Sequence, residues 1–335
     1  MPASIAPAPD AAPRLSALRI GVLQNPRSGT NLKAAAPMRR LFSDHPGIPC
    51  REVLDPASVA DALREMAERG VNTVAISGGD GTVNAVLNTV FGRSPFPRLP
   101  LLAVLRGGTA NMTARDIGMR GRQERALRAL IDCASRGGDG LAVIERPVMR
   151  IEPGAGREPI HGMFFGAAAI AQGIEYCKRD VHTLGLRGEI GPAVTMARFI
   201  IAMARGERAI IAPVPITIAV DGGAPSSFAC EIIYVTTLEQ LVLGLRPFWG
   251  RESAPLHYAS VRAAPRHWVK AFPGLLHGRP NRYVTPANGY ESRNVHRLLL
   301  GLDSPFFVDG EIFAPTAGAP LVFSDGGTAG FIRLR

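Results

Sequence analysis

The sequence predicts an α/β protein in two parts: an N-terminal doubly wound parallel sheet and a C-terminal domain of mostly antiparallel strands. Up to about residue 145, strand patterns alternate with helix patterns, which is typical of a parallel sheet covered by helices. Glycine-rich loops follow two of these strands. Beyond this point short β-branched runs are separated by Gly and Pro. We therefore predict a flexible tail over 1–16, an α/β domain over 17–145 and a β-rich domain over 146–335.

Each predicted strand of the α/β domain is followed by a loop and a helix. The apolar run 18–23 ends at the turn-forming sequence Asn25-Pro26-Arg27-Ser28-Gly29. The helix 57–69 starts after Asp55-Pro56, and its apolar residues Val59, Leu63 and Met66 fall on one face. In chain order we predict a strand over 18–23, a helix over 32–42, a strand over 51–54, a helix over 57–69, a strand over 71–76, a helix ending near 91, a strand over 100–105 and one more helix.

The β-rich domain contains short strand patterns and one strong helix pattern, over 190–204. Two apolar runs close the chain and flank Asp325-Gly326-Gly327, which predicts a terminal hairpin of strands 321–324 and 330–334. The other strands are predicted over 148–151, 216–220, 232–236 and 306–308.

The formal net charge of +10 favours an acidic partner such as a nucleotide or an anionic lipid surface. Nucleic acid is disfavoured, because the arginines are spread along the chain without interleaved aromatic residues. The four cysteines have no paired spacing, which predicts free thiols in a cytoplasmic protein. No run is long and apolar enough to span a bilayer, and the tail lacks the apolar core of a signal peptide.

The strongest local signal is Gly78-Gly79-Asp80-Gly81-Thr82-Val83-Asn84, between a strand and a helix. Glycines there allow a ligand to approach the backbone closely, and the amides at a helix start attract phosphate. The same tetrapeptide recurs as Gly137-Gly138-Asp139-Gly140 between a helix and a strand, where we predict only a turn. An ordinary glycine-rich turn is the alternative for the first copy as well.

Several common sites are not matched. There is no Gly-x-x-x-x-Gly-Lys-Ser/Thr sequence, and Asn84 stands where a dinucleotide fingerprint has its third glycine. The histidines lack metal-ligand spacing, and no Gly-x-Ser-x-Gly elbow is present. P-loop NTPase, dehydrogenase, zinc enzyme and common hydrolase functions are therefore disfavoured.

The order and separation of four motifs resemble those of the diacylglycerol kinase catalytic-domain family, which includes sphingosine kinases and bacterial lipid kinases. The motifs are Asn25-Pro26-Arg27-Ser28-Gly29, Gly78 to Asn84, Gly108-Thr109-Ala110-Asn111 with Ala114-Arg115, and Asp309-Gly310-Glu311. The second motif alone is shared with NAD kinases, which have a related fold. The resemblance implies a C-terminal β-sandwich, with the nucleotide held between the two domains.

The resemblance also implies roles for individual residues. The residues expected to hold ATP are Asn25, Ser28, Gly29, Gly79, Asp80, Gly81, Thr82, Asn84 and Thr109. Glu311 would be the general base, and Asp80 would contact Mg²⁺ directly or through water. Without the resemblance, Asp309-Gly310-Glu311 would be interpreted as a solvated hairpin turn.

The sequence departs from the family pattern at three places. Ala85 and Met112 replace acidic residues, and we expect both to begin helices at the site. The family's Asp-Asp-Gly element, associated with a structural metal, would fall within 249–257, where only Glu252 is acidic. The sequence thus predicts that this accessory metal site is missing.

We therefore expect an ATP- and Mg²⁺-dependent lipid kinase, a phosphotransferase acting on a hydroxyl of a diacylglycerol- or sphingoid-like lipid, peripheral at the cytoplasmic membrane surface. The basic, apolar helix 190–204 and the sequence Pro247-Phe248-Trp249 are candidates for contact with lipid, although core packing is the ordinary role of such a helix. Two alternatives stay open: a kinase of a soluble hydroxylated substrate, and a regulatory protein that binds nucleotide or lipid without catalysis. The sequence makes no prediction about oligomeric state.

Overall fold

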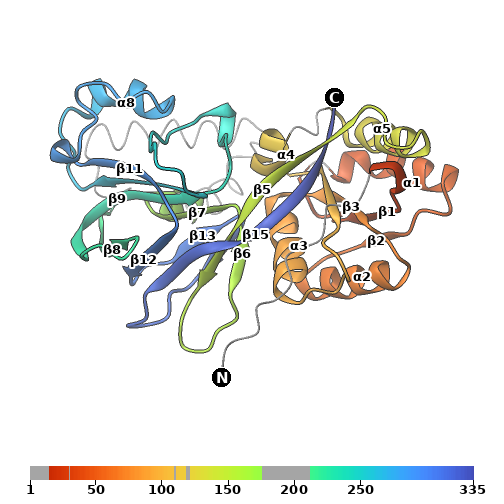
Figure 1. Cartoon of the computed structure of the whole chain (residues 1–335), viewed down its shortest axis with the longest axis horizontal. Helices are drawn as coiled ribbons and strands as arrows, with labels where there is room; N and C mark the ends of the chain where they lie inside the picture. Colours follow the sequence, from red (N-terminus) through yellow and green to blue (C-terminus); the bar gives the residue numbers. More distant parts are fainter. Residues whose placement is uncertain (1–14, 30, 109–110, 118–120, 176–211) are drawn as a thin grey trace.

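A computed structural model describes residues 15–29, 31–108, 111–117, 121–175 and 212–335 (Figure 1). Helices α1 to α5 surround one part of the molecule, and most of the later strands form the other. The elements in chain order are η1 (Leu15–Ala17), β1 (Ile20–Gln24), α1 (Asn31–Asp44), β2 (Cys50–Glu52), α2 (Pro56–Glu68), β3 (Thr73–Gly78), α3 (Asp80–Gly92), β4 (Leu101–Arg106), α4 (Met112–Ile117), α5 (Gln123–Ser135), β5 (Leu141–Glu152), β6 (Ile160–Gly162), β7 (Phe164–Ala168), β8 (Val214–Val220), β9 (Ser226–Thr236), η2 (Val242–Gly244), β10 (Leu256–Arg262), α8 (Trp268–Leu276), η3 (Pro286–Asn288), β11 (Tyr290–Val295), β12 (Arg297–Leu302), β13 (Phe306–Val308), β14 (Glu311–Phe313) and β15 (Leu321–Leu334).

The predicted doubly wound parallel sheet is confirmed, with strand order β2-β1-β3-β4 and parallel pairing throughout. Alternate side chains of β3 face opposite layers. Val74 and Ile76 pack with α2 and α3, whereas Ala75 packs with α1 and α5. Because β3 and β4 stay in register to their last residues, Gly78 and Arg106, the loops that follow both strands begin at the same edge of the sheet.

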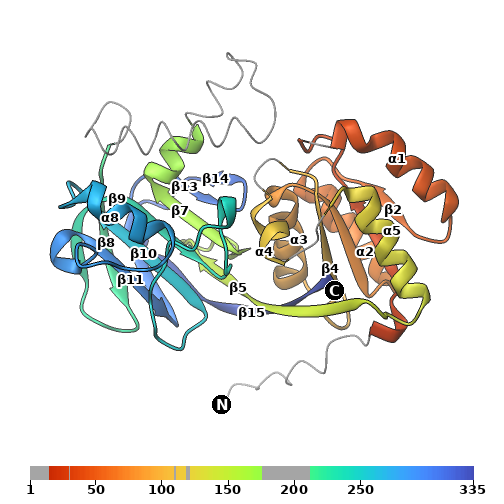
Figure 2. The same cartoon turned by 90° about the horizontal axis from the view of Figure 1, so that it is seen from above.

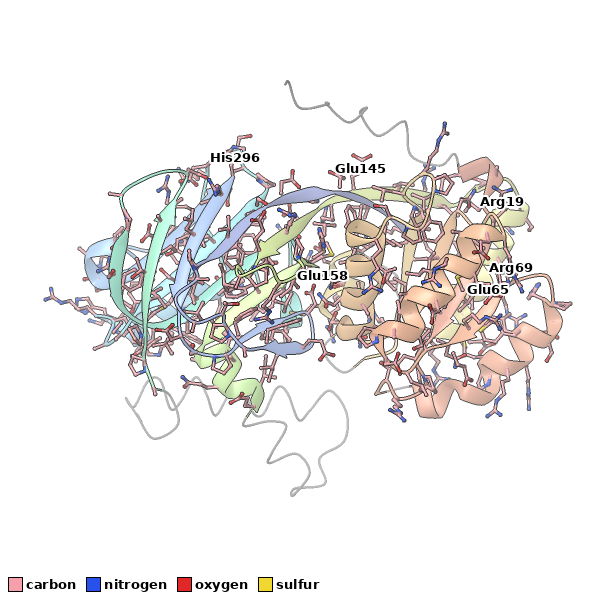
Figure 3. The ribbon with its side chains drawn as sticks, turned by 90° about the horizontal axis from the view of Figure 1, so that it is seen from below. Arg19, Glu65, Arg69, Glu145, Glu158 and His296 are labelled. Carbon is pink, nitrogen blue, oxygen red and sulfur yellow. The ribbon has the colours of Figure 1, made fainter. Side chains whose placement is uncertain are left out.

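The helix α2 begins where the sequence predicts, at a capping box. The Ser58 amide donates to Asp55 Oδ1 at 2.7 Å, and Pro56 occupies the first helical position. On the outer face of α2, Glu65 forms an ion pair with Arg69 at 2.8 Å (Figure 3). It forms a second one with Arg51 of β2 at 2.5 Å. Such exposed pairs add little to stability, so the apolar face of α2 holds it on the sheet.

The predicted terminal hairpin is wrong, because β15 is one continuous strand. Both of its halves pair antiparallel with β5, from Val322 opposite Glu152 to Leu334 opposite Leu141. Between Asp325 and Thr328 the strand holds one residue more than its partner, and Gly327 has a φ of +110°. Asp325-Gly326-Gly327 therefore forms a bulge that bends the strand and does not reverse it.

The paired strands β5 and β15 connect the two parts of the molecule (Figure 2). At its end β15 also joins the parallel sheet, where Phe331 pairs with Leu102 of β4. The division predicted at residue 145 falls inside β5, so it stays a prediction. The predicted antiparallel character of the later strands is confirmed, and they enclose an apolar core that includes Phe165, Ile233, Tyr258, Leu298 and Phe323.

The β-rich part also contains a helix, α8, that the sequence patterns did not predict. Pro273 lies inside it, and an internal proline is normally a signal against a helix. The helix predicted over 190–204 lies outside the described residues. None of the helices among the described residues is long and apolar enough to cross a membrane. The described cysteines Cys50, Cys133 and Cys230 are free thiols.

Candidate active site

Three loops meet at the carboxyl edge of the parallel sheet, after β1, β3 and β4. The Gly79 amide donates to Ser28 Oγ at 2.7 Å, and Asn25 Nδ2 donates to Thr82 Oγ1 at 3.1 Å. Gly29 is exposed in the same loop as Ser28. The structure thus brings the predicted residues Asn25, Ser28, Gly79 and Thr82 together across more than fifty positions of sequence.

The loops after β3 and β4 touch backbone to backbone, which requires glycine. A Cβ at Gly107 would lie 2.7 Å from Gly78 N, and a Cβ at Gly108 would lie 2.5 Å from Gly79 Cα. Asn111 closes the second loop in a left-handed conformation, because its Oδ1 accepts from the Gly108 amide at 2.9 Å and its Nδ2 donates to the Gly108 carbonyl at 2.6 Å. Thr109 lies outside the described residues.

The helix α3 starts at this meeting point with Gly79 as N-cap and without a side-chain cap. The Gly79 amide donates to Ser28 Oγ, and the Thr82 and Val83 amides donate to the Gly79 carbonyl. The amides of Asp80 and Gly81 have no carbonyl acceptor within the helix, and the Asp80 amide contacts its own carboxylate. Together with the helix dipole, they make this N-terminus suited to an anionic group such as phosphate.

The second Gly-Gly-Asp-Gly sequence supports this interpretation by contrast. Gly137, Gly138 and Gly140 all have positive φ and form a turn between α5 and β5. No helix begins there. The prediction that this copy is only a turn is confirmed.

The Asp309-Gly310-Glu311 turn, between β13 and β14, packs directly on the start of α3. Gly310 has a φ of +108°, and a Cβ there would lie 2.7 Å from Gly81 N. The carboxylate of Glu311 lies over the same residue, since a Cβ on Gly81 would be 2.9 Å from Glu311 Oε1. Glu311 is exposed. An accessible carboxylate therefore stands beside the helix N-terminus of the glycine-rich loop.

Asp309 anchors this turn, a role that the sequence analysis did not assign. Its side chain is 1% exposed and accepts from the amides of Met163 at 2.6 Å and Phe164 at 2.9 Å. Asn84 also donates to it, and Gly162 leaves it room. Burial raises the pKa of Asp309 to about 7, and the nearby Asp80 charge acts in the same direction. The only sequence signal for this role is its position two residues before Glu311.

We predict that Asp309 makes stability depend on pH between about 4 and about 7. The pKa of Asp309 in the folded protein, about 7, lies above the ordinary value of 3.8, so the folded protein holds this proton more tightly than the unfolded chain. The contribution of Asp309 to the free energy of unfolding should therefore fall as pH rises through that window.

Urea unfolding of the wild type and of Asp309→Asn, at a series of pH values, measures this effect. As pH rises from 4 to 7, the free energy of unfolding of the wild type should fall relative to that of Asp309→Asn. A difference that stays constant over this range would contradict the prediction.

Asp80, the first residue of α3, bridges to the next helix. Its carboxylate accepts from the amides of Met112 at 3.3 Å and Thr113 at 3.2 Å, so it caps α4. Asp80 is half-buried, and burial raises its pKa despite these hydrogen bonds. Mg²⁺ is usually bound by one or two carboxylates together with substrate phosphates and water. A single carboxylate beside a helix start suited to phosphate fits that donor set.

The two departures at Ala85 and Met112 take different forms. Met112 begins α4 as expected, but its side chain is buried and belongs to an apolar cluster. Ala85 does not begin a helix: it lies in the second turn of α3, which starts at Asp80, and it packs against the same cluster. The expectation that both begin helices was therefore wrong for Ala85. Both replacements add apolar packing where the family has carboxylates.

Asn84 lies deeper than expected for a residue that contacts nucleotide. It is 4% exposed, and its Nδ2 donates to the His161 carbonyl at 2.9 Å. Its side chain also meets Asp309. The observed contacts of Asn84 therefore hold α3 against β6 and the Asp-Gly-Glu turn.

Three buried polar residues beneath the loops form a hydrogen-bonded triad that was not predicted from the sequence. Gln123 Nε2 donates to Asn31 Oδ1 at 2.5 Å, Ser77 Oγ donates to Gln123 Oε1 at 2.5 Å, and Asn31 Nδ2 reaches the Ser77 carbonyl at 2.9 Å. Asn31 also donates to the Asn25 carbonyl at 2.6 Å. These contacts fix the first loop on β3. Asn31 and Gln123 begin α1 and α5, and Ser77 lies near the end of β3. Because these residues are far apart in sequence, no local pattern indicates their contacts.

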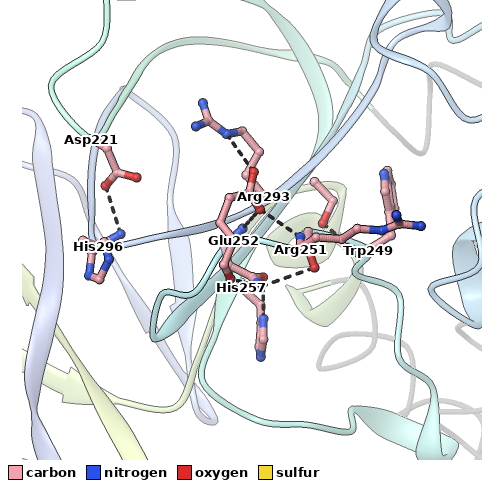
Figure 4. A network of polar contacts seen from close by, with 10 residues as sticks. Asp221, Trp249, Arg251, Glu252, His257, Arg293 and His296 are labelled. Carbon is pink, nitrogen blue, oxygen red and sulfur yellow. Dashed lines mark hydrogen bonds and ion pairs between the residues drawn. The ribbon is translucent and has the colours of Figure 1, made fainter.

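The region where the family's accessory metal element would fall contains a different kind of network (Figure 4). Glu252 accepts from the amides of Asn294 at 2.9 Å and Arg251 at 3.0 Å, and from Arg293 Nε at 3.4 Å. The Asn294 hydrogen bond is the main cause that lowers the pKa of Glu252. Its partners are hydrogen-bond donors, and among the described residues no group of three His, Cys, Asp or Glu side chains could hold a metal ion.

The fold and this geometry define a two-part α/β and β protein in which a glycine-rich helix start meets an acidic turn. Residues 19–143 match the family model of the diacylglycerol kinase catalytic domain, so this part of the chain is similar to that family. The sequence resemblance is thereby confirmed.

Two further comparisons agree. The chain is 30% identical over 122 residues to the protein named lipid kinase YegS of Escherichia coli K12, a match that covers 36% of this chain and 39% of that relative. The match thus spans about two fifths of the relative's length. A structure described as a diacylglycerol kinase from Bacillus anthracis Sterne aligns over 93% of this chain and 96% of its own, with a TM-score of 0.58 and 16% identity. A candidate diacylglycerol kinase from the same strain gives a TM-score of 0.63. At this identity the structures share the fold.

Proposed function

We propose that this protein is a lipid kinase that transfers the γ-phosphoryl group of ATP to a hydroxyl of a diacylglycerol- or sphingoid-like lipid. The single observation that supports this most strongly is the contact between the Asp309-Gly310-Glu311 turn and the start of α3. Phosphoryl transfer needs donors around the phosphates and a carboxylate for the proton of the attacking hydroxyl. The first amides of α3 and the Glu311 carboxylate, both close to Gly81, are the candidates for these two roles.

The proposed roles follow from the contacts. The amides of Asp80 and Gly81 would bind phosphate, while Asn25 and Ser28 hold the neighbouring loop in place. Glu311 would accept the proton of the substrate hydroxyl, and Asp80 would hold Mg²⁺. When bound, Mg²⁺ supplies positive charge that offsets the charge on the phosphates. Asp309 and Asn84 would act indirectly, by fixing the Asp-Gly-Glu turn on α3.

A lipid acceptor is favoured over a soluble one by the surroundings of Glu311. Ile312, directly after it, and Phe307, before the turn, pack in the same apolar cluster as Met112. Leu241, Val242 and Phe248, from the 238–249 segment, belong to this cluster too. An acceptor hydroxyl on an apolar molecule would thus have apolar neighbours as well as a base. Association with the membrane, at its cytoplasmic surface, is part of this proposal.

Incubation of the purified chain with labelled ATP, Mg²⁺ and a total lipid extract tests the proposal. We expect a labelled phospholipid, and separate reactions with diacylglycerol and with sphingosine would identify the acceptor class. Transfer only to glycerol or another soluble alcohol would favour the soluble-substrate alternative. ATP binding without transfer to any acceptor would favour a binding protein, in keeping with the apolar residues at Ala85 and Met112.

A further inference from the structure

The helix α8 turns an apolar face outward. Its inner face is made of small or buried residues, Ala271, Gly274 and Leu275, which pack on the β-rich part. Its other face carries Val269, which is 73% exposed, with Pro273 exposed and Phe272 and Leu276 half-buried. These four residues follow the i, i+3, i+4, i+7 spacing of one helix face. A surface helix of a soluble protein normally shows the reverse pattern.

The chain segment around α8 has an excess of positive charge. From residue 253 to residue 290 there is no Asp or Glu, whereas Arg262, Arg266, Lys270, Arg279 and Arg282 are all present. This segment thus accounts for five of the chain's ten net positive charges. All five belong to exposed residues. One carboxylate from outside the segment, that of Glu231, accepts from the Ala264 amide at 3.0 Å.

Local contacts hold two of these cations against one aromatic ring. Lys270 Nζ lies 5.3 Å and Arg282 Cζ 4.9 Å from the centre of the Tyr283 ring. The Arg282 hydrogen bond to the Tyr283 hydroxyl, at 2.8 Å, is the main cause that lowers the pKa of Tyr283. The Tyr283 ring thus holds two like charges next to α8.

The position of α8 suits a role in delivering an apolar substrate. It lies on the outer side of the β-rich part, away from the parallel sheet (Figures 1 and 2). The Arg246 amide donates to the Leu276 carbonyl at 3.2 Å, so the end of α8 is joined to the 238–249 segment. That segment carries the exposed Leu243, 60% accessible, and continues into the apolar cluster next to Glu311.

We propose that α8 and its flanking basic residues form a docking surface for an anionic lipid bilayer. This inference rests on the proposed function, which it extends by naming the surface that meets the membrane. Val269, Phe272 and Leu276 would enter the boundary between headgroups and acyl chains, while the cations would meet anionic headgroups. A bilayer is favoured over a protein partner because the helix offers an outward apolar face within a segment that has five basic and no acidic residues, which matches a negatively charged interface.

Vesicle co-sedimentation of the full chain tests this surface. The probes are vesicles of phosphatidylcholine alone and of phosphatidylcholine with phosphatidylglycerol. The wild type should prefer the anionic vesicles, and the preference should weaken with salt. The double variant Arg266→Glu/Lys270→Glu should lower the partition coefficient on anionic vesicles by about tenfold or more, since each basic residue near such a surface contributes on the order of 1 kcal/mol. Val269→Ser should lower binding to both kinds of vesicle.

Matched controls lie in the α/β part. Leu54→Ser removes another exposed apolar residue, 49% accessible, and Arg40→Glu/Arg125→Glu reverses two exposed arginines of α1 and α5. Both controls should bind anionic vesicles much better than their α8 counterparts do. Unchanged melting temperatures would show that the α8 variants remain folded.

The inference is overturned if the α8 variants bind anionic vesicles as the wild type does, or if the wild type does not prefer them. A protein partner for α8 would fall under this second outcome. Failure of the proposed function is a separate result: the wild type would then transfer no phosphate to any lipid, while the vesicle binding could still depend on α8. If both ideas hold, the α8 variants should lose activity on vesicle-bound lipid and keep it on a short-chain lipid dispersed in detergent.

Discussion

Replacement of Glu311 by Gln should lower the rate of phosphoryl transfer by roughly 10²–10⁴-fold and leave ATP affinity unchanged. The substitution keeps the size of the side chain over Gly81 and removes its ability to accept a proton. A general base acts on the acceptor hydroxyl, so nucleotide binding should not depend on it. Steady-state transfer rates and direct measurement of ATP binding, on the same preparations, test both parts.

The matched comparison is Asp80→Asn, which alters the neighbouring carboxylate at the same helix start. It should weaken nucleotide affinity and the Mg²⁺ dependence as well as the rate, because the proposed role of Asp80 is to hold the metal. Asp80 also caps α4 through Met112 and Thr113, so a modest loss of stability is expected. If Glu311→Gln transfers phosphate at the wild-type rate, the Asp-Gly-Glu sequence is only a turn and the assignment of the base is wrong.

Replacement of Gly81 by Val should abolish ATP binding in a protein that still folds. The φ of Gly81 is not in the left-handed region, so the backbone can accept a side chain. Its Cβ, however, would lie 2.9 Å from Glu311 Oε1, and the branched side chain would fill the space at the start of α3. A phosphate could then no longer approach the amides of Asp80 and Gly81.

Gly140→Val is the control for this experiment, since it changes the same position of the second Gly-Gly-Asp-Gly sequence. Gly140 has a φ of +83°, so valine there should lower the melting temperature and leave nucleotide affinity intact. Calorimetric titration with ATP, below the melting temperature of each variant, distinguishes the two. Wild-type affinity in folded Gly81→Val would mean that phosphate does not bind at this helix start.

Much of the α/β part could be predicted because its signals are local. Turn-forming loops, a capping residue such as Asp55 and apolar runs such as 71–76 specify each strand and helix within a dozen residues. The prediction that the site lies at the glycine-rich loops followed from the rule that ligands bind at the carboxyl edge of a parallel sheet. The terminal hairpin was predicted wrongly because Asp-Gly-Gly is compatible with both a reversal and a bulge. Only the partner strand β5, which runs alongside both halves of β15, selects the bulge.

The sequence by itself therefore determined the alternation of elements, the prediction that the Gly78–Asn84 loop binds phosphate and, through resemblance, the choice of Glu311. Only the tertiary structure decided that Glu311 lies over Gly81, that the buried Asp309 fixes it there, and that α8 exposes an apolar face. The physical reason is that each of these depends on contacts between residues far apart in the chain, or on which helix face is already covered by a neighbour. Local propensity and spacing contain no information about such contacts, because these arise only when the parts of the chain pack together.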